Sequence, residues 1–62
     1  MRVKEIIKYV VNDNIVIDRE IASGDWINVY RGACYDIPVS LLDREVQLIA
    51  PLNNNTIEIT IL

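Results

Sequence analysis

Histidine and phenylalanine are absent from this 62-residue chain, which holds one cysteine, Cys34, and two glycines, Gly24 and Gly32. A zinc site needs several thiolates or imidazoles, so this composition is too poor in ligands to form one. A single cysteine cannot close a disulfide within the chain. The chain has no histidine that could activate Cys34 as a nucleophile, and it contains no glycine-rich phosphate loop. We predict a protein without metal or cofactor, in which Cys34 is a small buried apolar residue.

Paired carboxylates are the remaining route to catalysis, and Asp18, Glu20 and Glu58 are the residues that would supply them. Acid–base work by such a pair requires a pocket that excludes water and separates the two pKa values. All three residues are expected on a flat sheet face, which offers no pocket of that kind. We therefore predict that the protein is not an enzyme.

Positive charge is scarce and scattered, since six Lys and Arg are dispersed among nine Asp and Glu for a net charge of −3. Nucleic-acid binding depends on clustered Lys and Arg that neutralise phosphates, so direct binding to DNA or RNA is not expected. No apolar run approaches the roughly 18 residues of a membrane span. Residues 1–8 are also too polar for a signal peptide. These features predict a cytoplasmic protein with a reduced thiol and no membrane association.

What the chain has in abundance is apolar side chains, at 52% of residues, which is enough to fold. The length predicts a single domain, 1–62, whose stability is thin because a chain of this size buries only about 60% of its surface. With disulfides and metals excluded, good packing or self-association must stabilise it.

The spacing of apolar residues predicts the order α-β-β-α-β-β. A helical stripe comes first and ends at a turn over residues 12–14; its members are Val3, Ile6, Ile7, Val10 and Val11. Two strands follow at 15–21 and 26–31, joined by a turn at 22–25 and ended by Gly32. A short helical turn at 38–43 begins with Pro38. Two further strands lie at 44–50 and 56–61, separated by Pro51 and a turn at 53–55.

This order predicts an α+β fold of two layers, with an antiparallel four-stranded sheet, one N-terminal helix and one short helical turn. The alternation within each strand assigns a core face and an opposite face. The expected core residues are Val3, Ile6, Ile7, Val10, Ile15, Ile17, Ile27, Val29, Leu41, Leu42, Val46, Leu48, Ile57, Ile59 and Ile61.

The opposite face is expected to be mostly polar, yet the alternation also places large apolar and aromatic side chains on it. Tryptophan and tyrosine are enriched at binding hot spots, so this face is a candidate partner or self-association surface. Its expected contact residues are Val16, Asp18, Glu20, Trp26, Asn28, Tyr30, Tyr35 and Ile49. The alternative is that the aromatic side chains merely shield the sheet, since scattered exposed apolar residues are common. A shift of one residue in register would also move each side chain to the other face.

One resemblance is carried by Val3-Lys4-Glu5-Ile6-Ile7, a strand pair, Asp36-Ile37-Pro38, and the segment Leu41-Leu42-Asp43-Arg44-Glu45-Val46 before an isoleucine-alternating end. This pattern resembles a loose group of small uncharacterised proteins from bacteria and their prophages. The resemblance implies a role in occluding a host protein, as anti-CRISPR inhibitors do, and those are typically small, acidic and non-enzymatic. Two hypotheses follow: a protein-binding inhibitor of that type, or a structural or accessory homodimer.

Overall fold

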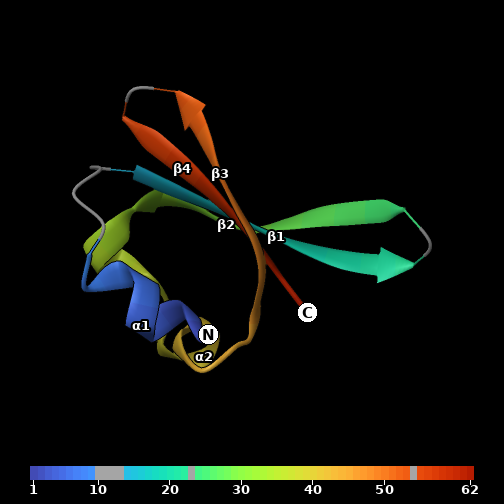
Figure 1. The fold of residues 1–62 in the computed structure, drawn as a ribbon, viewed down its shortest axis with the longest axis horizontal. Helices are drawn as coiled ribbons and strands as arrows, with labels where there is room; N and C mark the ends of the chain where they lie inside the picture. Colours follow the sequence, from blue (N-terminus) through green and yellow to red (C-terminus); the bar gives the residue numbers. More distant parts are fainter. Residues whose placement is uncertain (10–13, 23, 54) are drawn as a thin grey trace.

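A computed structural model describes residues 1–9, 14–22, 24–53 and 55–62. Its elements are α1 (Val3–Ile7), β1 (Asn14–Ala22), β2 (Asp25–Ala33), a 3-10 turn η1 (Cys34–Asp36), α2 (Val39–Leu42), β3 (Val46–Asn53) and β4 (Thr56–Ile61). The predicted α+β class and the order of helices and strands are confirmed (Figure 1). The expected helical residues Val10 and Val11, and parts of all three predicted turns (12–13, 23 and 54), lie outside the described residues.

The sheet has the strand order β2-β1-β4-β3 and is mixed. The two hairpins, β1–β2 and β3–β4, are antiparallel because short turns reverse the chain. At the centre, however, β1 and β4 run parallel, so the prediction of a purely antiparallel sheet is wrong. These two strands are joined through two hairpins and the connection that holds η1 and α2, and that connection is long enough to bring β4 back beside β1 in the same direction.

Two strands extend beyond the residues that were predicted to end them. β2 continues through Gly32, which pairs with Ile15. β3 continues through Pro51, which pairs with Ile57. Proline is tolerated there because β3 is an edge strand, where a missing N–H need not leave a ladder bond unmade.

The core lies where α1 meets the two central strands. Its buried members are Val3, Ile6, Ile15, Ile17, Ile37, Ile59 and Ile61. Six of the seven were predicted from the spacing, and the exception, Ile37, stands before Pro38 outside any periodic segment. Other predicted core residues are partly buried and pack against this cluster: Ile7, Val29, Leu41, Leu42, Val46 and Ile57.

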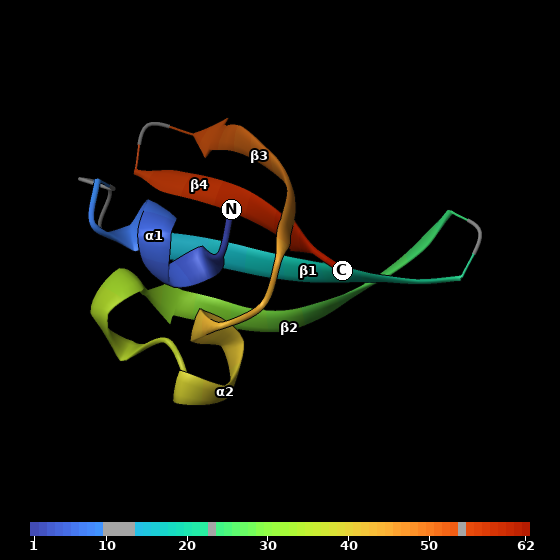
Figure 2. The ribbon, with the colours of Figure 1, turned by 60° about the horizontal axis from the view of Figure 1, so that its bottom comes forward.

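The β1–β2 hairpin forms an arm that projects beyond the rest of the sheet (Figures 1 and 2). Pairing between β1 and β4 stops at Arg19 and Ile61, so the residues beyond Arg19 that the structure describes pair only within the hairpin. This explains why Ile27, predicted as core, is 42% exposed: it pairs with Arg19, where the body of the sheet ends.

A β-bulge in β2 changes which way its side chains face. Ile17 pairs with Tyr30 and Asp18 pairs with Asn28, which leaves Val29 as the extra residue. Tyr30 therefore shares a face with Ile17 and packs against the core cluster. The prediction that Tyr30 faces away from the core is wrong, because one inserted residue reverses the alternation.

A second irregularity in β3 has the same effect. Val46 pairs with Ile61, but Leu48 pairs with Thr60 and Ile49 pairs with Ile59. Ile49 thus lies on the core face at the sheet edge, 44% exposed, and Leu48 lies on the opposite face, 54% exposed. Both assignments from simple alternation are wrong.

Residues at both ends of the chain form backbone hydrogen bonds with the segment that leads into β3. The backbone N–H of Val46 donates to the Met1 carbonyl at 2.7 Å, and the N–H of Val3 donates to the Arg44 carbonyl at 3.0 Å. The N–H of Leu62 donates to the Glu45 carbonyl at 3.2 Å. These bonds position β3 and β4 together, and with them the side chains on the face away from the core.

Ion pairs reinforce the same segment at the surface. Lys4 Nζ lies 2.8 Å from Asp43 Oδ1, and the hydrogen bond and charge of Lys4 lower the pKa of that carboxyl. The N-terminal amine of Met1 lies 3.1 Å from Glu45 Oε2. Because all of these groups are exposed, water and salt screen the attraction, and we assign the backbone bonds the larger role.

Candidate binding site

We call the sheet face opposite the core cluster the outer face. The paired residues on this face form two rows that run across the four strands: Asn28-Asp18-Thr60-Leu48 and Arg31-Val16-Glu58-Ala50. Trp26 pairs with Glu20 in the next row along the hairpin. Each strand of the sheet therefore contributes side chains to this face.

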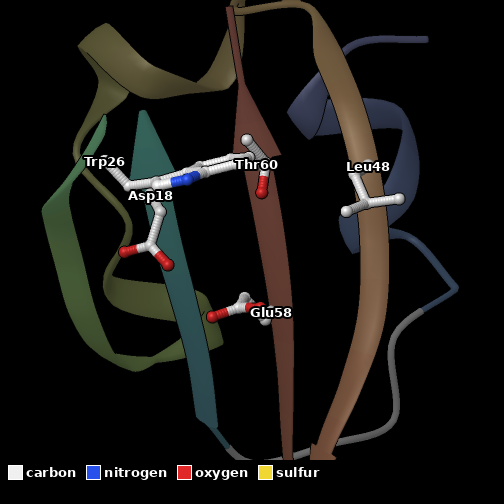
Figure 3. A pocket seen from close by; sticks show the side chains of 5 residues that line it. All are labelled: Asp18, Trp26, Leu48, Glu58 and Thr60. Atoms are coloured by element: carbon white, nitrogen blue, oxygen red, sulfur yellow. The ribbon is translucent and has the colours of Figure 1, made fainter. Parts of the chain in front are cut away.

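The outer face holds a pocket of about 310 Å³ (Figure 3). Its lining residues come from all four strands: Asp18, Trp26, Leu48, Glu58 and Thr60. The outer face is therefore hollowed at this point and not flat. The prediction concerned a pocket that excludes water, whereas this one is open to solvent. Trp26 on β2 and Leu48 on β3 line the pocket from the two edge strands of the sheet.

The carboxyl groups of Asp18 and Glu58 both line this pocket. Interaction with the Asp18 carboxyl, through hydrogen bonding and its negative charge, raises the pKa of Glu58, and burial raises it as well. Two neighbouring carboxylates repel each other when both are ionised, which favours the protonated form of Glu58. The pocket thus carries a negative charge whose size depends on pH.

Asn28 holds Asp18 in place. Its Nδ2 donates to Asp18 Oδ1 at 3.0 Å and also lies within bonding distance of two backbone carbonyls, Ile17 O at 3.2 Å and Tyr30 O at 3.1 Å. The amide therefore occupies the bulge and satisfies carbonyls there. The bulge and the carboxyl orientation are coupled through this one side chain.

Trp26 and Thr60 form the other walls. In Figure 3 the indole of Trp26 reaches from β2 across β1 toward Thr60 on β4, seen nearly edge-on above the two carboxyl groups. Thr60 is only 3% exposed, and its hydroxyl oxygen points toward the side of the pocket that holds Glu58 (Figure 3). Among the described residues, no side-chain hydrogen bond involves this hydroxyl.

The structure brings together only some of the predicted contact residues. Trp26, 48% exposed, lies on the outer face with Asp18, Glu20 and Asn28, as the alternation predicted. Val16 is on the same face but only 3% exposed, so a partner cannot reach its side chain.

Three predicted contact residues lie elsewhere. Tyr30 and Ile49 share the core face with Ile17 and Ile59, and Tyr35 is 87% exposed in η1, outside the sheet.

Two pocket residues were absent from the predicted contact set although their alternation in 56–61 placed them on the outer face: Glu58 and Thr60. Leu48 was also missed, and no local signal identifies it, because its position depends on the irregular pairing of β3 with β4.

Replacing Glu58 with glutamine is expected to stabilise the protein at pH 7. The raised pKa of Glu58 means that its contribution to folding is fully present below its unfolded pKa and is lost as the pH rises through the folded value. An amide at this position removes the repulsion and can donate to Asp18. We expect a gain of about 0.5–1 kcal/mol in the free energy of unfolding, measured by urea denaturation, for a like-charge pair on neighbouring strands.

The gain should shrink as the pH falls through the raised pKa of Glu58, because the wild-type carboxyl is then protonated. Glu20→Gln, an exposed change on the arm, serves as the control and should alter stability by less than about 0.5 kcal/mol. Equal or lower stability of Glu58→Gln at pH 7 contradicts the repulsion between the Asp18 and Glu58 carboxylates.

Comparison with known protein families, with curated proteins and with solved structures finds no match to this chain. The resemblance to small bacterial and prophage proteins therefore stays a prediction. In the part of the chain that the structure describes, no helix is long and apolar enough to cross a membrane. Within those same residues, no three Cys, Asp or Glu side chains gather as a metal site.

Proposed function

We propose that this chain is a small, non-enzymatic protein-binding module that docks a partner on its outer face. The observation that carries the proposal is the position of Trp26, half exposed at the wall of a pocket that also exposes Leu48 and two carboxyl groups. Interface hot spots combine an aromatic anchor with a desolvated pocket and a polar surround, which this arrangement provides. A two-layer arrangement is part of the proposal: the helices cover the core face and leave the outer face for the partner.

The biological role we propose is occlusion of a host protein by a phage or mobile-element product, in the manner of an anti-CRISPR inhibitor, within the cytoplasm. What supports it is the small size, the net charge of −3 and the resemblance described above. An acidic face suits a target with a basic surface, such as a protein that handles nucleic acid, because complementary charge speeds and orients docking.

Trp26→Ala is expected to leave the fold intact and to abolish capture of the partner. The side chain lies outside the core cluster, so its removal costs little stability, whereas loss of a central aromatic anchor costs about 2 kcal/mol or more of binding energy. The measurement is an affinity pull-down from host lysate with quantitative mass spectrometry, comparing wild type with the variant.

Tyr9→Ala is the matched control, since Tyr9 is an 84% exposed aromatic after α1, away from the outer face. It should retain every protein that the wild type captures. A partner captured equally by the Trp26 and Tyr9 variants rules out the outer face as the docking surface.

A homodimer is the second candidate, favoured by the arm. Ile21 and Ile27 are 54% and 42% exposed there, on a hairpin whose described residues beyond Arg19 pair only with each other. A molar mass near twice 7.1 kDa by light scattering supports the dimer, and a monomer at micromolar concentration removes it.

Acid–base catalysis is a third candidate, because Asp18 and Glu58 line one pocket and Asp18 raises the pKa of Glu58. A pair of neighbouring carboxyl groups also suits recognition of a positive charge, which is the use a binding module would make of it.

A further inference from the structure

The two edge strands of the sheet, β2 and β3, differ in how well they are protected from pairing with another chain. An edge strand presents unpaired backbone N–H and C=O groups, and proteins commonly protect such edges with charged side chains or a β-bulge. β2 has both, because it carries Asp25 and Arg31 and bulges at Val29. The Asn28 side chain also donates to the Tyr30 carbonyl within this strand. Pairing at the β2 edge is therefore disfavoured.

β3 has no charged side chain along its whole length, Val46–Asn53. In the described part of the chain, its only neighbouring strand is β4. Three large apolar side chains on β3 are about half exposed, Leu48 (54%), Ile49 (44%) and Leu52 (47%). The register shifts of β3 lie on either side of residues 48–51, which pair regularly with β4. An uncharged, apolar edge of this kind is a site where another strand can add.

The beginning of this edge already pairs with an antiparallel segment. The N-terminal residues form an antiparallel bridge with Glu45, and the Val46 N–H donates to the Met1 carbonyl at 2.7 Å. The Leu62 N–H, which follows β4, donates to the Glu45 carbonyl on the other side of the strand. Among the described residues, nothing pairs with the outward side of residues 47–53. An antiparallel strand therefore fits against this edge, and most of the edge is open.

We propose that the β3 strands of two copies of this chain pair antiparallel across a two-fold axis at Ile49, and so join two four-stranded sheets into one. A two-fold axis brings the same patch of both copies together, so a charged residue on the axis meets its own like charge. The uncharged β3 edge avoids that repulsion. On the outer face, the large side chain of Leu48 lies opposite the small side chain of Ala50 of the second copy.

The core face favours a second copy as the occupant of this edge. Cross-strand pairs form an apolar row on that face, Tyr30-Ile17-Ile59-Ile49, and the row ends at the half-exposed Ile49. In the dimer Ile49 lies opposite Ile49 of the second copy, so the row continues into the second core and both side chains lose contact with water. A foreign strand needs an apolar residue at the matching position, whereas a second copy has it by symmetry.

The paired stretch is short. The N-terminal segment occupies the edge before residue 47, and Pro51 has no N–H to donate. Residues 47–51 of each copy therefore form the contact. An interface this small is typical of weak association, and we expect a dissociation constant of about 100 μM.

This inference goes beyond the proposed function and does not depend on it. Pairing takes place in the plane of the sheet, at the edge opposite β2, so Trp26 of each copy stays accessible on the outer face. The dimer also differs from one formed through the arm, whose exposed residues Ile21 and Ile27 lie on β1 and β2.

The test is sedimentation equilibrium of the whole protein from about 10 μM to about 1 mM, a range that brackets the expected constant. The average molar mass should rise from near 7.1 kDa toward twice that value. Over the same range, the NMR amide signals of residues 47–50 should shift, and those of residues 25–28 on the arm should stay fixed. In a mixture of isotope-labelled and unlabelled protein, a nuclear Overhauser contact should join Ile49 side chains of different copies.

Ile49→Lys should weaken the association at least about tenfold, because it places like charges opposite each other on the axis. Ile27→Lys is the matched control, since it adds the same charge on the other edge strand at a side chain of nearly equal exposure, 42%. It should leave the association unchanged. Circular dichroism reports whether both variants fold; if Ile49→Lys does not, the amide shifts and the contact between wild-type copies decide.

Three results overturn the β3 dimer. The first is a molar mass that stays near 7.1 kDa up to about 1 mM. The second is a set of amide shifts confined to the arm, and the third is equal weakening of the association by Ile49→Lys and Ile27→Lys.

Discussion

Ile59→Ala is expected to leave most of the protein unfolded at 25 °C. Ile59 is 0% exposed and pairs with Ile17 on one side and Ile49 on the other, so it stands at the centre of the sheet against α1. Truncation of a buried isoleucine to alanine costs about 2–5 kcal/mol, from lost transfer energy and the cavity left behind. A core in a chain of this size supplies only about 3–5 kcal/mol of net stability, so the loss consumes most of it.

The measurement is urea denaturation followed by far-UV circular dichroism, with the signal in buffer alone as the first readout. Ile21→Ala is the matched control, because it removes the same atoms from a side chain that is 54% exposed on the arm. It should cost less than about 1 kcal/mol. A cooperative transition of Ile59→Ala at nearly the wild-type urea concentration contradicts the central position of Ile59.

Tyr30→Ala is expected to cost about 2–4 kcal/mol of stability, within the range for truncating large core side chains. The ring packs against the core cluster, and the hydroxyl donates to the Ala33 carbonyl at 2.6 Å. Partial burial, with the nearby Asp36 charge, raises the pKa of this phenol. Gly32 fits the same region, since a Cβ there would lie 3.1 Å from the Tyr30 hydroxyl.

This experiment also decides between two readings of β2. Strict alternation places Tyr30 beside Trp26 as a contact residue that can be removed without loss of fold. The bulge at Val29 places it on the core face, where it is partly buried against the core cluster. Tyr35→Ala, at 87% exposure, is the control and should change stability by less than about 0.5 kcal/mol. A Tyr30→Ala variant as stable as that control contradicts the bulge.

Much of the fold could be predicted because it depends on local patterning. The alternation in 56–61 predicted β4 with its observed bounds, Thr56–Ile61, and the isoleucines of both central strands were assigned to the core correctly. In each case the alternation of apolar residues that predicts the strand lies within the same few residues that form it. The composition likewise limited the available chemistry, since a chain without histidine and with one cysteine has few ligands or nucleophiles to offer.

Strand order and register could not be predicted in the same way, because they depend on residues distant in the chain. The parallel pairing of β1 with β4 joins segments separated by two hairpins. The bulge at Val29 and the irregular pairing of β3 each shift the alternation by one residue, which moved Tyr30 and Ile49 to the core face and Leu48 to the outer face.

The candidate site is the feature that local sequence patterns predicted least well. Trp26, Asp18 and Glu58 were each recognisable as residues of the outer face, but a pocket requires that side chains from four strands converge. That convergence follows from the order β2-β1-β4-β3 and from the two register shifts, which brought Leu48 to one side of Thr60 and Asp18 to the other. Periodicity along one strand assigns a face to each side chain, whereas only the pairing of strands decides which side chains on that face are neighbours.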